Sequence, residues 1–242
     1  MYAHFFKRIF DFFLSLIALV LLSPILLFLM ILGSIKMRGN PFFVQPRPGK
    51  DEKIFYLIKF RTMTNEKDAE GNLLPDEKRL VPYGKLLRST SLDELPELIN
   101  ILKGDMAIVG PRPLLIRDMI FMTKDQRKRH TVRSGLTGLA QVSGRNAINW
   151  EEKLTIDLKY INRITFFGDF IIILKTIGKV FDRDGINEEG MATATDLCDY
   201  LLCKGLISQK EYDQKMVQVA NILMKTKRQR TNIRGKNENM VN

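Results

Sequence analysis

The chain has 242 residues, 45% of them hydrophobic and 27% charged, and its 38 Lys and Arg against 27 Asp and Glu give a net charge of +11. This length allows one soluble domain with its own core plus an appendage, and the positive charge favours anionic partners such as phosphates, lipid headgroups or nucleic acid. The two histidines, His4 and His130, are far apart, which excludes a histidine-based metal site or triad. Cys198 and Cys203 indicate reduced cytosolic thiols, because their spacing fits neither a disulfide nor a zinc site.

An uncharged, apolar segment runs from Phe12 to Ile35. It is long enough to cross a bilayer, since a helical span needs about 20 residues. Pro24 removes a backbone donor and clashes with the carbonyl four residues earlier, so the sequence predicts a kink or break at Ser23-Pro24. Each resulting half, of about 12 residues, is too short to span the bilayer.

Positive charges flank this segment on both sides, at Lys7, Arg8, Lys36 and Arg38. Such charges mark the cytoplasmic side of a membrane, so both ends are expected there. Residues 1–40 are therefore interpreted as a re-entrant helix-break-helix in one leaflet, in which Ser23 helps to satisfy the carbonyls that Pro24 leaves unpaired. From this segment alone, a kinked single-pass helix is an equally good interpretation. A cleaved signal peptide is excluded by the length of the apolar run.

The next segments predict a β-hairpin, with strands at 42–45 and 54–60 around a turn at Pro46–Gly49. Residues 64–80 are charged and predict an exposed loop. A helix should follow, because apolar residues recur at helical spacing at Leu95, Leu98, Ile99 and Leu102, before Gly104.

Further along, residues 119–130 are apolar and then basic, which suits a lipid–water interface, although an ordinary amphipathic surface helix is favoured by this stretch alone. Glycines from Gly135 to Gly144 predict a loop. Helices are expected around 150–162 and 166–180, the second too short to span and either packed or interfacial. From about residue 192 the pattern predicts two helices joined at Gly205 and a basic tail that is disordered or lies against anionic lipid.

Among the acidic residues, Asp93 and Glu94 stand out because they lie at the expected start of the helix that contains Leu95. A helix N-terminus carries unpaired N–H groups and partial positive charge, which can hold a carboxylate ionised and receive a phosphate. The alternative is a capping box, Ser91-x-x-Glu94, in which Glu94 only satisfies a backbone donor. By itself, the pair favours capping over catalysis.

Basic residues occur in the polar segments around that pair, at Arg47, Lys59, Arg61, Arg88 and Arg112. Arg112 lies between Pro111 and Pro113, which restrict the backbone, so its planar guanidinium loses less entropy on binding a phosphate. A carboxylate pair near several cations and a membrane segment favours chemistry on phosphorylated substrates over nucleic-acid binding.

Several motifs follow one another between about residues 5 and 190: Lys7-Arg8-Ile9-Phe10-Asp11, Ser23-Pro24, Gln45-Pro46-Arg47-Pro48-Gly49, Lys59-Phe60-Arg61-Thr62-Met63, Arg88-x-x-Ser91-Leu92-Asp93-Glu94-Leu95-Pro96, Lys103-Gly104-Asp105-Met106, Gly110-Pro111-Arg112-Pro113 and Gly135-Leu136-Thr137-Gly138. In this order they resemble the bacterial sugar transferases, the monotopic polyprenyl-phosphate phosphoglycosyl transferases, and most closely the compact PglC type. The resemblance implies a mostly α fold with a small β-hairpin, in which a re-entrant membrane helix joins a helical catalytic domain at the membrane surface.

The resemblance also implies a reaction. Asp93 would attack the β-phosphorus of a UDP-sugar and expel UMP, and undecaprenyl phosphate would then take the phosphosugar from the aspartate. Glu94 would bind metal or handle a proton beside Asp93, with Mg²⁺ held by these two carboxylates. Arg112 would bind the transferred phosphate, and Lys59 and Arg88 are weaker candidates for the same role.

The organisation expected from this resemblance has three parts: the membrane helix (1–40), the catalytic domain (41–190) and a helical extension (191–242) that is somewhat similar to a SHOCT-type motif and implies self-association. The likeness to the PglC type implies UDP-N,N'-diacetylbacillosamine or a related amino sugar as donor. The alternatives are UDP-glucose, UDP-galactose or a UDP-N-acetylhexosamine for capsule or O-antigen. The expected location is the cytoplasmic face of the bacterial inner membrane. A different hypothesis is a membrane-anchored basic scaffold without catalytic activity.

Overall fold

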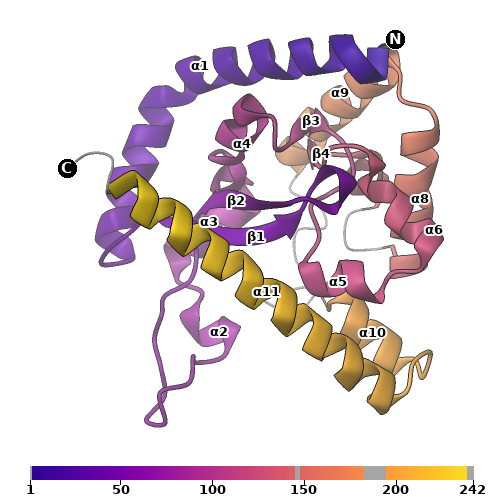
Figure 1. The fold of residues 1–242 in the computed structure, drawn as a ribbon. Coiled ribbons are helices and arrows are strands. Elements are labelled where there is room, and N and C mark those ends of the chain that lie inside the picture. The colour runs from indigo at the N-terminus through magenta and orange to yellow at the C-terminus, as the bar shows by residue number, and fades with distance from the viewer. Residues whose placement is uncertain (1, 145–147, 183–194, 239–242) are drawn as a thin grey trace.

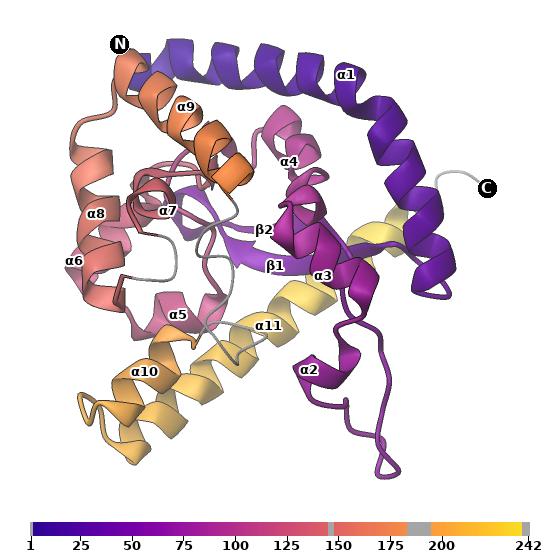
Figure 2. The same cartoon turned by 180° about the vertical axis from the view of Figure 1, so that it is seen from behind.

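A computed structural model describes residues 2–144, 148–182 and 195–238, and Figures 1 and 2 show it from opposite sides. Most of these residues are helical, and the predicted class, mostly α with a small hairpin, is confirmed. In chain order the elements are a π-helix η1 (Tyr2–Phe6), α1 (Lys7–Lys36), β1 (Phe42–Pro48), the 3₁₀ turn η2 (Lys50–Glu52), β2 (Ile54–Phe60), α2 (Asp76–Arg79), α3 (Pro82–Ser89), the 3₁₀ turn η3 (Leu92–Glu94), α4 (Glu97–Lys103), β3 (Ala107–Val109), α5 (Ile116–Phe121), α6 (Lys124–Arg127), the 3₁₀ turn η4 (Lys128–Thr131), β4 (Gly135–Thr137), α7 (Leu139–Ser143), α8 (Trp150–Asn162), α9 (Phe166–Asp182), α10 (Leu197–Cys203) and α11 (Gln209–Glu238).

Helix α1 continues through Pro24 and does not break there. The absent N–H of Pro24 would have bonded the carbonyl of Val20, and the hydroxyl of Ser23 donates to that same carbonyl over 2.7 Å. The two halves of α1 run in clearly different directions (Figure 1), so the interruption is a bend within one helix. The predicted kink at Ser23-Pro24 is therefore confirmed, and the alternative of a break into two separate helices is wrong. The expected role of Ser23 toward the unpaired carbonyl is also confirmed.

The surface of α1 is largely apolar and exposed. Within the described residues it is the one helix long and apolar enough to cross a membrane, and only Asp11, Ser15, Leu29 and Gly33 of it are buried. The exposed side chains include Phe28 and several leucines and isoleucines. An apolar surface of this length is suited to lipid and not to water.

Both ends of α1 contact the domain that follows. Near its start, Arg8 donates to the carbonyls of Ile101 and Leu102 at the end of α4, over 2.6 and 2.8 Å. Near its end, the hydroxyl of Tyr83 in α3 donates to the carbonyl of Leu29 over 3.1 Å. The helix therefore arches over one domain and is attached to it on both sides of the bend (Figure 2).

The β-hairpin pairs β1 with β2 in antiparallel register, from Phe42 opposite Phe60 to Pro48 opposite Ile54. The predicted turn at Pro46–Gly49 is wrong. Pro46 and Pro48 lie within β1, and the chain reverses at 49–53. Proline cannot donate to a ladder, so it is tolerated on an edge strand such as β1. The outer edge of β2 instead bonds the side-chain amide of Asn100, which fixes α4 beside the hairpin.

A short parallel pair, β3 with β4, is absent from the sequence prediction, which expected a loop at Gly135. The two backbones approach so closely that a Cβ on Gly135 would lie 2.1 Å from the amide nitrogen of Gly110. The glycines here are therefore required by backbone packing, and not by a turn. The predicted loop at 64–80 is largely exposed, but it contains the short helix α2.

The stretch 119–130 is part of the core, so its prediction as a lipid-interface or surface helix is wrong. Met119, Phe121 and Met122 are buried, as are Arg129 and His130. The apolar side chains are covered by α10 and α11, elements that periodicity within 119–130 cannot reveal. The later helices agree with the prediction: α8 and α9 form where expected, and Gly205 joins α10 to α11 with a positive φ of 68°. The expectation of a disordered basic tail is wrong, because α11 continues through these basic residues to Glu238.

Helix α9 exposes a row of apolar side chains that includes Phe167, Phe170 and Leu174, while Asp169 and Ile172 are buried. Its inner side is held next to the start of α1 by an ion pair between Lys7 and Asp169 at 2.6 Å. The two cysteines carry free thiols, as predicted, with Cys198 buried and Cys203 exposed. The predicted boundary between domain and extension, near residue 191, lies outside the described residues.

Candidate active site

The carboxylates of Asp93 and Glu94 lie in η3, a 3₁₀ turn just before α4. The turn is entered through Ser91 in the left-handed region, with φ of 56°, an uncommon conformation for a residue other than glycine. The capping-box interpretation is wrong, since Ser91 makes no side-chain cap bond and its N–H donates to the carbonyl of Arg88. The carboxylate of Glu94 is directed elsewhere.

Glu94 binds two cations with one oxygen. Its Oε1 lies 2.7 Å from Nζ of Lys59 in β2 and 2.9 Å from a terminal nitrogen of Arg112, in the segment between β3 and α5. Burial alone would raise the pKa of Glu94, but Lys59 and Arg112 outweigh it and lower that pKa to about 2. Glu94 is therefore a permanent anion that fixes two cations in place.

A third carboxylate, Glu97, belongs to this cluster and was not predicted. It is buried in the first turn of α4 and lies 3.1 Å from Lys59, so that Lys59 bridges Glu94 and Glu97. Burial, and the negative charge of Glu94, raise the pKa of Glu97 to about 7 against the opposing effect of Lys59. Its position three residues after Glu94, on the same side of a helical turn, was the signal available in the sequence.

Asp93 differs from its neighbours because no hydrogen bond or ion pair to its carboxylate occurs among residues 2–144, 148–182 and 195–238. Burial and the adjacent charge of Glu94 raise its pKa to about 6, while Lys59, Arg112 and Arg88 oppose the rise. Near neutral pH Asp93 is therefore mostly ionised, yet more basic than an ordinary aspartate. An unpaired, partly desolvated carboxylate beside cations has the properties of a nucleophile.

Arg112 is held by its backbone and directs its side chain outward. Its carbonyl accepts a bond of 2.7 Å from Arg129, which also forms an ion pair of 2.7 Å with Asp157 in α8. Arg129 and Asp157 are both buried. The guanidinium of Arg112 is about half exposed and reaches Glu94, so it can contact a ligand without leaving the cluster.

The other basic residues named from the sequence differ in their position relative to this cluster. Lys59 is at the centre of the cluster, whereas Arg88 lies at its side, donating from Nε to the hydroxyl of Thr62 over 3.1 Å while interacting electrostatically with Asp93. Arg47 is a structural residue, since it donates to the carbonyl of Pro113. The structure thus brings Asp93, Glu94, Lys59 and Arg112 together, with Arg88 nearby.

Comparison with known proteins identifies the family. A family model described as bacterial sugar transferase matches residues 2–183. The chain belongs to the bacterial sugar transferase family. It is 47% identical over 188 residues to the uncharacterized sugar transferase EpsL of Bacillus subtilis, a match that covers 78% of this chain and 93% of that protein.

Two further relatives have names that state a reaction. The chain is 33% identical over 201 residues to the undecaprenyl-phosphate galactose phosphotransferase of Salmonella typhimurium, covering 76% of this chain and 42% of that protein. It is 37% identical over 186 residues to the UDP-glucose:undecaprenyl-phosphate glucose-1-phosphate transferase of Klebsiella pneumoniae. This match covers 73% of this chain and 40% of that protein. The chain spans about two fifths of these two longer relatives.

The long apolar helix α1 of this sugar transferase packs directly behind the candidate site. Ala18, Leu19 and Leu22 of α1 contact the core that contains Leu98 and Ile101 of α4. Because α4 follows the turn with Asp93, the height of that turn relative to α1 is fixed by apolar packing. The pair Ser23-Pro24 lies in the bend of α1 and contributes shape, not chemistry, to the site.

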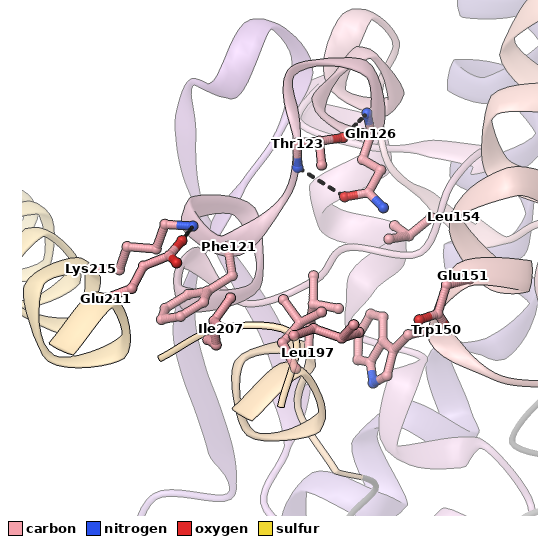
Figure 3. Close-up of a pocket in the computed structure, with 12 residues that line it drawn as sticks. Phe121, Thr123, Gln126, Trp150, Glu151, Leu154, Leu197, Ile207, Glu211 and Lys215 are labelled. Atoms are coloured by element: carbon pink, nitrogen blue, oxygen red, sulfur yellow. Dashed lines mark hydrogen bonds and ion pairs between the residues drawn. The ribbon is translucent and has the colours of Figure 1, made fainter. Parts of the chain in front are cut away.

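A separate cavity of about 220 Å³ lies away from these residues, at the seam between the sugar transferase domain and its C-terminal helices (Figure 3). Its walls include Phe121 of α5, Trp150 of α8 and Leu197 of α10. Glu211 and Lys215 of α11 pair with each other at its rim, over 2.9 Å. None of the predicted site residues lines it, so it belongs to the docking of α10 and α11.

Within the described residues, no three His, Cys, Asp or Glu side chains come close enough together to hold a metal ion by themselves. The two cations bind Oε1 of Glu94, and Lys59 also binds Oε1 of Glu97, which leaves the oxygens of Asp93 and the second oxygens of Glu94 and Glu97. Mg²⁺ commonly takes one or two protein carboxylates together with substrate phosphates. This donor set fits a metal that is completed by a phosphorylated ligand.

Proposed function

We propose that this chain transfers hexose 1-phosphate from a UDP-hexose to undecaprenyl phosphate and releases UMP. Membership of the sugar transferase family and the names of the Salmonella and Klebsiella relatives support this reaction. The observation that carries the proposal is the free carboxylate of Asp93 in a cluster whose other acidic groups are bound by cations. The scaffold hypothesis has no comparable support, because the family is one of enzymes.

For the donor, the comparisons favour the alternative over the acetylated amino sugar that the sequence predicted. Relatives are named for galactose and glucose, among them the UDP-galactose-lipid carrier transferase of Erwinia amylovora, which is 34% identical over 200 residues. UDP-galactose and UDP-glucose are therefore the donors proposed here. They differ only in the configuration of one hydroxyl, so a panel of UDP-sugars is needed to separate them.

In the first step, an oxygen of Asp93 attacks the β-phosphorus of the donor, to which the sugar is attached. The bond from that phosphorus to the bridging oxygen breaks, UMP leaves with the electron pair, and an aspartyl phosphosugar remains. An anion can approach a diphosphate only if nearby cations offset the repulsion. Arg112, half exposed beside Asp93, is suited to the transferred phosphate, and Arg88 to its far side.

In the second step, an oxygen of undecaprenyl phosphate attacks the same phosphorus, the bond to Asp93 breaks, and the carboxylate is regenerated. The lipid diphosphosugar is released. Lys59 keeps Glu94 and Glu97 from repelling the incoming phosphate, because it bridges them at 2.7 and 3.1 Å. Glu97, with a pKa of about 7, can take up or release a proton as the charge in the site changes.

We expect Mg²⁺ to bind with the donor, held by Asp93 and Glu94 together with oxygens of the diphosphate. Bound there, the ion would neutralise charge on the diphosphate and on the leaving UMP. The residues of this chain supply the remaining charge balance, through Lys59 and Arg112.

For the membrane, we propose that α1 is re-entrant and that the site lies on the cytoplasmic face. A straight helix from Arg8 to Leu29 would be about 32 Å long, close to the thickness of the hydrocarbon core. Both residues nevertheless contact one domain, through α4 and α3. A domain on one side of a bilayer cannot reach both ends of a spanning helix, so this double attachment supports a helix that enters and leaves on the same side.

The test of the chemistry uses donor labelled in its β-phosphate. Without acceptor, the wild-type chain should retain label on the polypeptide and release UMP, and undecaprenyl phosphate should discharge the adduct. Asp93→Asn should form no adduct and lose turnover by a factor on the order of 10³ or more. Asp68→Asn, in the exposed loop, is the matched control and should behave as wild type. Turnover by Asp93→Asn, or turnover of wild type without an adduct, contradicts the mechanism.

Topology is tested by labelling single cysteines introduced at Ala3 and Asn40 in vesicles of known orientation. A re-entrant helix places both on the cytoplasmic side. Labelling from opposite sides would mean that α1 spans the membrane.

A further inference from the structure

Helix α11 lies outside the family match, which ends at residue 183, and yet it is firmly attached to the catalytic domain. Val219 packs with Ile116 and Met119 of α5. The hydroxyl of Tyr56 in β2 donates to the carbonyl of Thr226 over 3.0 Å. The guanidinium of Arg230 lies 4.6 Å from the centre of the Tyr56 ring. The direction of α11 is therefore set by the hairpin.

That direction is toward the membrane helix. Along α11, Val219 lies near Ile54 and Thr226 near Tyr56, so the helix follows β2 toward Phe60. Phe60 in turn packs in one cluster with Leu29 of α1. Figures 1 and 2 show α11 rising from α10 toward the second half of α1. Its C-terminal end thus lies on the side of the molecule where α1 exposes its apolar surface.

The charge of this segment is entirely positive. Residues 214–237 contain no Asp or Glu and seven Lys or Arg. Four of these cations are exposed, and they are called here the basic end of α11: Lys225, Lys227, Arg228 and Arg230. None of the four forms an ion pair with any residue that the structure describes. Thr226 is buried against the domain, and Arg230, on the same side of the helix, lies over the ring of Tyr56. Lys225, Lys227 and Arg228 are exposed around the rest of the helix.

A groove next to the basic end adds room for a ligand. It has a volume of about 420 Å³, and Tyr56, Ile58, Lys103 and Arg230 are among its lining residues, together with Asp105. Tyr56 and Ile58 point to the face of β2 opposite Lys59, since side chains alternate along a strand. The groove is therefore separate from the site with Asp93, and its two cations are available to a different anion.

We propose that the basic end of α11 binds the headgroups of anionic phospholipids in the membrane that holds α1. Unpaired cations near a membrane surface each attract anionic lipid, and a second attachment of this kind strengthens a first one made by apolar insertion. A second copy of this chain is a poor occupant, because it would bring the same charge to the surface. The inference rests on the membrane association of α1 and does not depend on the reaction at Asp93.

The experiment uses the full-length chain in nanodiscs of phosphatidylcholine alone, or with about a third phosphatidylglycerol. Exposed lysines are acylated with an amine-reactive reagent, and the rate at each lysine is read by mass spectrometry. Lys225 and Lys227 should react more slowly with phosphatidylglycerol present, by a factor on the order of 5, and salt near 0.5 M should abolish the difference. Lys67 and Lys78, exposed in the loop 64–80, should react at the same rate in the two kinds of nanodisc.

Two variants with equal loss of charge make the test specific. In Lys227→Gln/Arg228→Gln, the protection of Lys225 by phosphatidylglycerol should fall by at least about half. In the control variant Lys67→Gln/Lys78→Gln, the protection of Lys225 should be unchanged. Equal reactivity of Lys225 in both lipids overturns the proposal, as does protection that survives in the first variant or that is already complete in phosphatidylcholine. The readout needs no turnover, so its failure is distinct from failure of the proposed reaction.

Discussion

Two groups of charged residues lie close together in this protein, and they are built differently. Arg129 and Asp157 form a buried pair in which one guanidinium meets one carboxylate, with a further bond to the carbonyl of Arg112. In the other cluster Lys59 bridges Glu94 and Glu97 and Arg112 binds Glu94, while Asp93 pairs with neither cation. The first group is balanced, and the second has an excess of negative charge.

The balanced pair has a structural role, whereas the cluster has the properties of a catalytic site. In the balanced pair one positive charge meets one negative charge, and Arg129 also holds the carbonyl of Arg112, so the pair fixes the position of the segment around Arg112. In the cluster, burial together with the negative charge of Glu94 raises the pKa of Asp93 to about 6 and that of Glu97 to about 7, while Lys59 and Arg112 lower that of Glu94 to about 2. Three carboxylates within one turn and a half of chain thus have three different protonation behaviours, which is typical of a catalytic site.

The largest effect is expected when the cluster loses its central cation. Lys59→Gln leaves Glu94 and Glu97 without their shared partner, so the repulsion toward a diphosphate rises. UMP release should fall by a factor on the order of 10³. Lys53→Gln, an exposed lysine of the same hairpin, is the control and should retain wild-type rates. If Lys59→Gln keeps more than about a tenth of the activity, the assignment of Lys59 is wrong.

Breaking the balanced pair should act first on stability. Asp157→Asn leaves the buried charge of Arg129 uncompensated, which should lower the free energy of unfolding by about 3–5 kcal/mol, measured by thermal or chemical unfolding in detergent. Activity should fall as well, because the carbonyl of Arg112 loses a firm donor.

The double variant Arg129→Met/Asp157→Leu separates the two effects. Apolar side chains of similar volume should restore much of the stability. UMP release should remain at least about tenfold low, since no residue then holds the backbone of Arg112. A double variant with full activity would show that Arg129 has only a structural role.

The smallest effect should be a gain in stability. The pKa of Asp93 is higher in the folded chain than the ordinary 3.8, so its contribution to stability is greatest at low pH and is lost as pH rises through about 6. Asp93→Asn should therefore be more stable than wild type above pH 7, by about 1–3 kcal/mol, and nearly equal to it at pH 4. Unfolding midpoints at both pH values measure this. Equal midpoints at pH 8 would mean that Asp93 is not under the repulsion described here.

Several features were predictable because their signals are local. The apolar run of α1, the helical spacing through Leu98, Ile99 and Leu102 and the stop at Gly104 depend on neighbouring residues, and all were found. The helix begins only at Glu97, so Leu95 lies in the turn before it. The predicted turn at Pro46–Gly49 failed, because proline is also compatible with an edge strand. The stretch 119–130 failed for a different reason, since the helices that bury it come some 80 residues later.

The same division holds for the site. Asp93, Glu94, Lys59, Arg88 and Arg112 were selected from the sequence by residue type, motif and proline context. Glu97 was not, because its importance comes from burial and from contact with a lysine 38 positions earlier. Residue types and spacing show which charges the chain carries, but they do not show which carboxylates share a cation in the folded protein.

The sequence alone determined that this chain has a helix long and apolar enough to cross a membrane, an acidic pair among basic residues and a basic C-terminal segment, because these are properties of composition and short-range order. Only the tertiary structure decided that Glu94 is bound by Lys59 and Arg112, that Asp93 is free and that α11 points toward α1. The physical reason is that pairing of charges depends on distances of a few ångströms between residues far apart in the chain, which packing of the whole domain sets.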